Sequence, residues 1–151
     1  MSENVQKTAL MFHFKGDMNG RHNFPGKPAL NPILGILFIL GLVLSVRKIN
    51  EYPNKLFLFY FLVSLLPTFL TLPQDNPNMN RTFTVLPAVI YFVIYSIRFL
   101  STINFKINKQ YLIMFFTGII FISSIIELRT YFLYQSRVFK NSFEVKCSID
   151  E

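Results

Sequence analysis

Four long apolar stretches, separated by short polar or basic segments, limit what this sequence can fold into. Each is long enough to cross the roughly 30 Å hydrocarbon core of a bilayer, which needs about 17 to 25 residues of helix. Lipid offers no water to backbone groups, so a crossing segment satisfies them internally, as a helix does. We therefore expect an all-α membrane protein with four transmembrane helices, at residues 30–46, 56–72, 83–100 and 111–128.

The composition supports a membrane setting, since 52% of the residues are hydrophobic and 18 are Phe. Fifteen Lys and Arg residues exceed eight Asp and Glu residues, which gives a formal charge of +7. The basic residues lie between the apolar stretches and form no single stripe, so lipid headgroups are the expected counter-charge. This pattern favours membrane lipids as partners and disfavours nucleic acid.

The two ends of the chain have the composition of segments that lie at a membrane surface. Val5, Ala9 and Phe12 recur at helical spacing, which predicts an interfacial helix before a polar loop. The C-terminal segment mixes aromatic residues with Arg129 and Arg137. We divide the chain into an outer helix and loop (1–29), a four-span bundle (30–128) and an outer interfacial tail (129–151).

Orientation follows from the short loops, because cytoplasmic loops carry an excess of Lys and Arg. The loop between the second and third stretches contains one basic residue, Arg81. The other two loops hold Arg47, Lys48 and Lys55, and Arg98, Lys106 and Lys109. These two loops are predicted to be cytoplasmic, with both ends and the Arg81 loop outside. Both ends are also basic, so charge alone leaves the orientation nearly even.

The polar loop "FKGDMNGRHNFPGKP" (14–28) is rich in residues that favour turns. Asp17, within "GDMNG", is interpreted first as a turn-capping residue that bonds its own backbone, and second as a functional carboxylate. The residues expected to shape the loop are Gly16, Asp17, Asn23, Pro25, Gly26 and Pro28.

The order of these residues resembles bacterial membrane glycosyltransferases of the GT-C superfamily, in the branch of the protein O-mannosyltransferases and the aminoarabinose transferase of lipid A. In that branch an outer loop of the form GD-x-x-x-RHN-x-PG-x-P leads into a span that starts with a turn, here at residues 30–32. The likeness continues in "NRTFTVLPAV" (80–89) and "YFLYQSRVFKNSF" (131–143), and so runs from about Glu3 to Val145.

The resemblance implies an enzyme that moves a sugar from a polyprenyl-phosphate carrier to an acceptor at the outer face of the bacterial cytoplasmic membrane. It places the loop at 14–28, the Arg81 loop and the C-terminal tail outside. Such enzymes are longer, and their catalytic carboxylates lie in a preceding membrane region. The chain is therefore expected to be the C-terminal portion, a fragment or a split subunit, inactive without an N-terminal partner that carries the catalytic loop.

The carboxylates, considered independently, agree with that expectation. Glycosyl transfer generally needs a carboxylate, and often a pair, to activate the acceptor or stabilise cationic charge. Only Asp17 and Asp75 are placed to meet at an outer site, and both occur in sequences typical of turns. We assign no catalytic residue, and we expect no cofactor.

Arg21, His22 and Arg81 are the predicted ligands of a lipid phosphate, because guanidinium groups fork onto phosphate oxygens. The alternative is that each Arg reaches bulk lipid headgroups or pairs with Asp17 or Asp75. The spacing of His13, Asp17 and His22 fits no standard zinc site, so no metal is expected.

Within the spans, Gly41 and Ser45 form a small-xxx-small pair, which is expected to let the first helix pack closely against a neighbour. Small residues in the fourth span are expected to do the same, namely Gly118, Ser123 and Ser124. Ionisable residues are absent from the predicted mid-membrane positions, which disfavours a small transporter. A non-enzymatic membrane assembly or accessory protein is the main alternative to a transferase.

Overall fold

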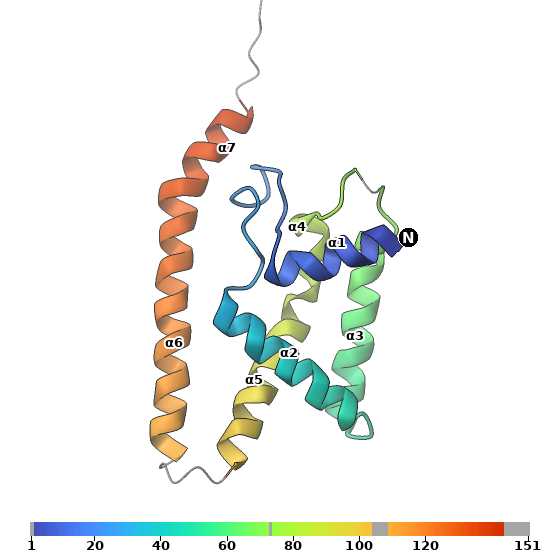
Figure 1. Ribbon diagram of the computed structural model, residues 1–151, viewed down its shortest axis with the longest axis vertical. Coiled ribbons are helices and arrows are strands. Elements are labelled where there is room, and N and C mark those ends of the chain that lie inside the picture. Colours follow the sequence, from blue (N-terminus) through green and yellow to red (C-terminus); the bar gives the residue numbers. More distant parts are fainter. Residues whose placement is uncertain (1, 73, 104–108, 144–151) are drawn as a thin grey trace, which may run out of the picture.

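The computed structural model describes residues 2–72, 74–103 and 109–143, and every element in them is helical (Figure 1). The all-α prediction is confirmed for this part of the chain, whereas residues 144–151 of the predicted tail lie outside it. The elements are α1 (Ser2–His13), α2 (Pro32–Arg47), α3 (Tyr52–Phe69), α4 (Met79–Thr82), the 3-10 turn η1 (Phe83–Val85), α5 (Leu86–Thr102), α6 (Lys109–Arg129), the π-helical segment η2 (Thr130–Gln135) and α7 (Ser136–Phe143).

Two helical segments of the described chain are long and apolar enough to cross a membrane. They are Met79–Thr102, with 24 residues, and Gln110–Lys140, with 31. α2 and α3 reach this standard only as a pair, bent by 119° at their junction. α2 has 16 residues, and α3 begins with the polar run "YPNK". The structure thus has two candidate spans, or three if the bent pair counts as one, and four spans remain a prediction.

The closest helix contact joins α2 to α5, and small residues make it possible. A Cβ at Gly41 would lie 1.8 Å from the carbonyl oxygen of Phe92, so the two backbones touch. Ser45, one turn further along α2, is completely buried. The predicted packing role of this pair is confirmed. Gly118 differs, because a Cβ there would meet no atom within 4 Å, and Ser124 is exposed.

Four phenylalanine rings from four helices form the centre of the core. Phe12 of α1 stacks on Phe38 of α2 with ring centroids 5.5 Å apart. Phe38 lies 5.9 Å from Phe61 of α3 and 6.0 Å from Phe92 of α5. Burying aromatic rings of this size stabilises a fold through both area and ring geometry. α1 is therefore part of the bundle core, and not an appendage.

α1 confirms the predicted N-terminal helix, whereas its position at a membrane interface stays a prediction. Asn4 and Thr8 are buried, whereas Val5 is 44% exposed and Ala9 is also exposed. The reason is a polar contact with the segment after α3, where the Asn4 side-chain amide donates to the carbonyls of Phe69 (3.0 Å) and Thr71 (2.6 Å). α1 thus buries Met11 and Phe12 together with Asn4 and Thr8, and leaves Val5 and Leu10 exposed.

The polar segments gather at one end of the bundle. Figure 1 shows α1, the loop after it, the turn after α3, η2 and α7 at that end, with the α2–α3 corner at the other. We call residues 14–31, 70–82 and 130–143 the polar end. The start of α2 and the end of α3 both lie nearer to this end than the corner that joins them (Figure 1).

The predicted C-terminal tail continues the last long helix through η2 and α7 as far as Phe143. Its Gln135 side chain is buried and donates to the carbonyl of Gly20. Nearer the middle of the long helix, Glu127 of α6 forms an ion pair with Lys27 of the loop. The long helix is thus attached to the polar loop. Most of its surface is exposed, since only 6% of its most apolar stretch is buried.

We predict that Gly41→Ala destabilises the fold by about 1–3 kcal/mol or more, because the new methyl group would push α2 away from the α5 backbone. Gly118→Ala is the matched control, and its stability should be unchanged or slightly higher, since Ala favours helix and the site is open. Thermal unfolding in detergent micelles measures both. Equal melting temperatures for the two variants would contradict the close α2–α5 contact.

Candidate functional site

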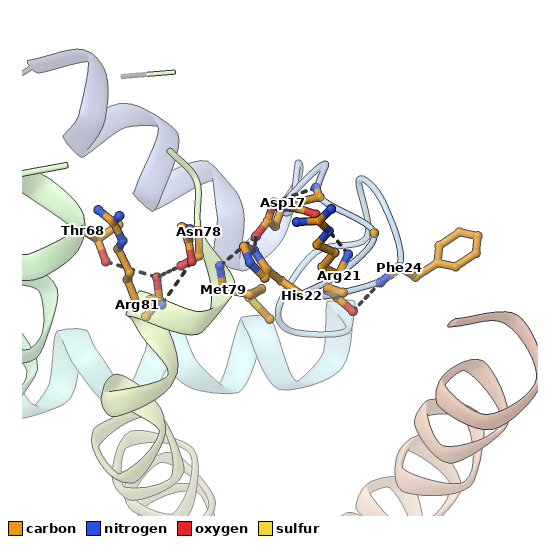
Figure 2. Close-up of polar contacts among 12 residues, drawn as sticks. Asp17, Arg21, His22, Phe24, Thr68, Asn78, Met79 and Arg81 are labelled. Carbon is orange, nitrogen blue, oxygen red and sulfur yellow. Dashed lines mark hydrogen bonds and ion pairs between the residues drawn. The ribbon is translucent and has the colours of Figure 1, made fainter. Parts of the chain in front are cut away.

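Asp17 is the centre of the hydrogen bonding at the polar end (Figure 2). Its carboxylate is 4% exposed and accepts from the Asn19 amide (2.8 Å), from His22 Nδ1 (2.7 Å) and from the Met79 amide (3.0 Å). The Asn19 contact is the predicted turn capping, which is confirmed. The bond to Met79 was not predicted, and it fixes the loop to the start of α4.

The Asp17–His22 contact leaves one imidazole nitrogen for other uses. An ionised carboxylate only accepts hydrogen bonds, so His22 donates from Nδ1. Nε2 is then the acceptor of a neutral ring, or a second donor if the ring is protonated. His22 Nε2 makes no hydrogen bond to any residue that the structure describes. This nitrogen is available to a ligand.

The polar loop is a closed, tight structure that depends on two glycines. A Cβ at Gly16 would lie 1.7 Å from the Lys27 carbonyl oxygen, and Gly26 has φ +77°, a conformation that favours glycine. The Gly26 amide donates to the Asp17 carbonyl (2.8 Å), and Asn23 Nδ2 to the Lys27 carbonyl (3.3 Å). These contacts involve four of the residues predicted to shape the loop, and the roles of Pro25 and Pro28 stay predictions.

A second polar segment lies against the loop and is equally constrained. Asn76 is 5% exposed and donates from Nδ2 to the carbonyl of Asn4 (3.0 Å). Asn78 caps α4, since its side chain accepts from the Arg81 amide (3.2 Å). Capping of this kind satisfies a backbone donor at the helix start. The segment is thus fixed at both ends of its Asn-Pro-Asn sequence.

The two segments enclose a cleft of about 310 Å³, which we call the polar cleft. It contains the two acidic residues that the sequence placed at an outer site, Asp17 buried and Asp75 exposed. The lining residues are Asp17, Met18, Asn19, His22, Gln74, Asp75, Asn76, Pro77 and Asn78. Most of these side chains can donate or accept hydrogen bonds.

The three predicted phosphate ligands are placed differently. His22 lines the polar cleft, whereas Arg21 and Arg81 are exposed and are not among its lining residues. Figure 2 shows Arg21 and Arg81 on opposite sides of the contact between Asp17 and Met79. The Arg81 guanidinium donates to Thr71 Oγ1. Both cations therefore lie outside the lining of the cleft.

A second, more open groove of about 520 Å³ lies on the other side of the loop. It is lined by Phe24, Pro25, Gly26 and Lys27 of the loop and by Thr130 and Tyr134 of η2. The rings of Phe24 and Tyr134 meet edge to face, with centroids 6.5 Å apart. Pro28, also half-buried, leads from the loop toward α2. The polar loop thus separates a polar cleft from an aromatic groove.

Sequence reasoning missed several of these contacts. Asn78 carried a recognisable signal, since Asn before an apolar helix is a common N-cap. Gln74 and Asn76 had only the signal of a turn-rich segment. Gln135 lies within a helix and had none. The Met79 amide had no sequence signal, because every residue type except proline supplies the same donor.

His13 is unrelated to His22 in space, because its Nε2 lies 3.1 Å from the Gly35 carbonyl and its ring packs near Phe38. Within the described ranges, no three His, Cys, Asp or Glu side chains come together in an arrangement that could hold a metal ion. Comparisons of the chain with protein-family models, curated proteins and solved structures found no match.

We predict that Asp17→Asn lowers the free energy of unfolding by about 1.5–3 kcal/mol, because it removes charge-assisted bonds and turns an amide group toward a backbone donor. Asp75→Asn is the matched control and should stay within about 0.5 kcal/mol of wild type, since Asp75 is exposed. Denaturant unfolding in micelles gives both values. A similar small effect for both variants would mean that Asp17 does not hold the polar end together.

Proposed function

We propose that this chain is the membrane portion of a bacterial glycosyltransferase that uses a polyprenyl-phosphate sugar, and that its polar end binds the lipid-linked donor. The observation that carries this proposal is the folded polar surface at one end of an apolar helical bundle, flanked by Arg21 and Arg81. A bilayer around the helices would put this surface at headgroup depth, where a lipid phosphate lies.

In the proposed arrangement, α2, α3, the segment from α4 to α5, and α6 make four crossings of the cytoplasmic membrane. The polar end faces outward, because the basic residues of the α2–α3 corner, such as Arg47 and Lys48, favour the cytoplasm. The resemblance of the sequence to GT-C enzymes supports the same orientation. α1 would lie along the outer interface, with Val5 and Leu10 toward lipid.

Phosphate recognition in this proposal relies on Arg21 and Arg81. A guanidinium group presents planar donors that match phosphate oxygens, and a charge-assisted hydrogen bond contributes about 1.5–3 kcal/mol. Arg81 already orients its guanidinium toward the Thr71 hydroxyl, which limits the conformations it must give up on binding. His22, whose Nδ1 donates to Asp17, lines the polar cleft and would present its Nε2 to the group joined to that phosphate.

The chemical step needs groups from elsewhere. The Asp17 carboxylate is occupied by three hydrogen bonds, and Asp75 is the only other carboxylate among the described residues of the polar cleft. We therefore propose that catalytic carboxylates come from an N-terminal region or partner subunit, and that this chain alone does not transfer sugar. The aromatic groove and the exposed α6 face are surfaces that such a region would cover.

The exposure of α6 also favours the second candidate function, a membrane assembly or accessory protein. Only 6% of the most apolar stretch of Gln110–Lys140 is buried, so the helix packs little against its own chain. A helix of this kind would bind another membrane protein through close packing. Binding of a lipid phosphate at the polar end distinguishes the two functions, because the accessory role does not require it.

We predict that replacing both Arg21 and Arg81 with Gln weakens binding of a short-chain polyprenyl phosphate by about ten- to a hundredfold, through loss of the charge-assisted bonds. Lys48→Gln is the control, since Lys48 is exposed at the opposite end of the bundle. Titration of the lipid into the purified chain in nanodiscs measures the affinities. The proposal would be refuted by equal affinities for all variants, or by no binding to wild type.

A further inference from the structure

The polar cleft has walls that are fixed before any ligand binds. Asp17 and Asn76 are at least 95% buried, and both are held by hydrogen bonds to other segments. Asn78 is committed to capping α4. These contacts determine the shape of the cleft, so its other lining groups face a preformed space.

Three lining groups have hydrogen-bonding capacity to spare. The side chains of Gln74 and Asp75 are exposed and make no hydrogen bond to a described residue, and the same is true of His22 Nε2. An amide both donates and accepts, a carboxylate accepts, and the imidazole does either according to its protonation. Met18 and Pro77 add an apolar patch to the same lining.

This mixture of groups identifies the chemistry of a ligand. Hydroxyl groups both donate and accept, so a polyhydroxylated ring could engage the amide, the carboxylate and the imidazole together. The C–H face of such a ring would lie on the apolar patch. The volume of about 310 Å³ is at the small end of ligand pockets, which suits one sugar ring and not a large molecule.

The charges in the cleft limit the ligand further. Among the described residues that line the cleft there are two carboxylates and neither Lys nor Arg, so a phosphate or an acidic sugar would be repelled. Arg21 and Arg81 are outside this lining and lie on opposite sides of the Asp17–Met79 contact (Figure 2). A sugar joined to a lipid phosphate can therefore lie in the cleft while its phosphate stays at the rim beside an arginine.

We infer that the polar cleft is the sugar subsite of the donor and that it takes a single sugar ring without negative charge. This inference rests on the proposed function, because it assigns the sugar of the same lipid-linked donor whose phosphate the arginines bind. Asp75 and Gln74 contact the ring hydroxyls, and Asp17 acts as a positioning residue that holds His22 against the ring.

The test compares three phosphodiesters of one short polyprenol, which carry a methyl, a glucosyl or a glucuronosyl group. All three share the same phosphodiester charge, so differences in affinity report on the group in the cleft. The full chain in nanodiscs should bind the glucosyl lipid about tenfold more tightly than the methyl lipid, the effect of one or two added hydrogen bonds. The glucuronosyl lipid should bind no more tightly than the methyl lipid.

The double variant Gln74→Ala/Asp75→Ala should lose the tenfold preference for glucose and keep the affinity for the methyl lipid within about threefold. Asn80→Ala, at an exposed position on α4 outside the cleft, is the matched control and should keep the preference. Using the ratio of the two affinities cancels any general effect of removing the Asp75 charge.

Three other results would overturn the inference in distinguishable ways. If wild type binds glucosyl and methyl lipids equally, or if the double variant keeps the preference, the cleft is not the sugar subsite. The proposed function would still stand if both lipids bind in a manner that depends on Arg21 and Arg81. If none of the lipids binds, both proposals are wrong.

Discussion

The arrangement of the polar end depends on how one buried carboxylate is satisfied. Removing Asp17 from water is costly unless donors replace the water, and here the donors come from its own turn, from His22 and from the Met79 amide. Since Asp17 and Met79 are far apart in the sequence, this requirement brings the loop against α4. The polar cleft exists because these two segments meet, and Arg21 and Arg81 lie on opposite sides of that contact for the same reason.

The sequence predicted those features that depend on local chemistry. Apolar stretches predicted helices, the Gly41–Ser45 pair predicted close packing, and "GDMNG" predicted the capping of a turn, because each follows from a few neighbouring residues. Long-range contacts could not be predicted. The buried polar face of α1 depends on Asn4 reaching carbonyls after α3, and the attachment of η2 depends on Gln135 reaching Gly20. Backbone acceptors of this kind are the same at every residue.

The core and the polar end of the bundle are held together by different interactions. At the core, four phenylalanine rings in mutual contact and a backbone contact at Gly41 fix how α1, α2, α3 and α5 pack. At the polar end, hydrogen bonds hold exposed segments in a defined shape, as the proposed binding of a lipid phosphate requires. α6 is part of neither the core nor the polar end. The long helix is attached to the loop through Lys27 and Gln135, and most of its surface is left for lipid or for another protein.

The central claim is that the polar loop and the α4 segment form one surface on the outer face of the membrane. Single cysteines at Met18, Asn80 and Asn50, all exposed, test it in intact cells after the only native cysteine, Cys147, is replaced. An impermeant thiol reagent should label positions 18 and 80 and leave position 50 unlabelled until the membrane is opened. Labelling of only one of positions 18 and 80, or of position 50 alone, would contradict the account.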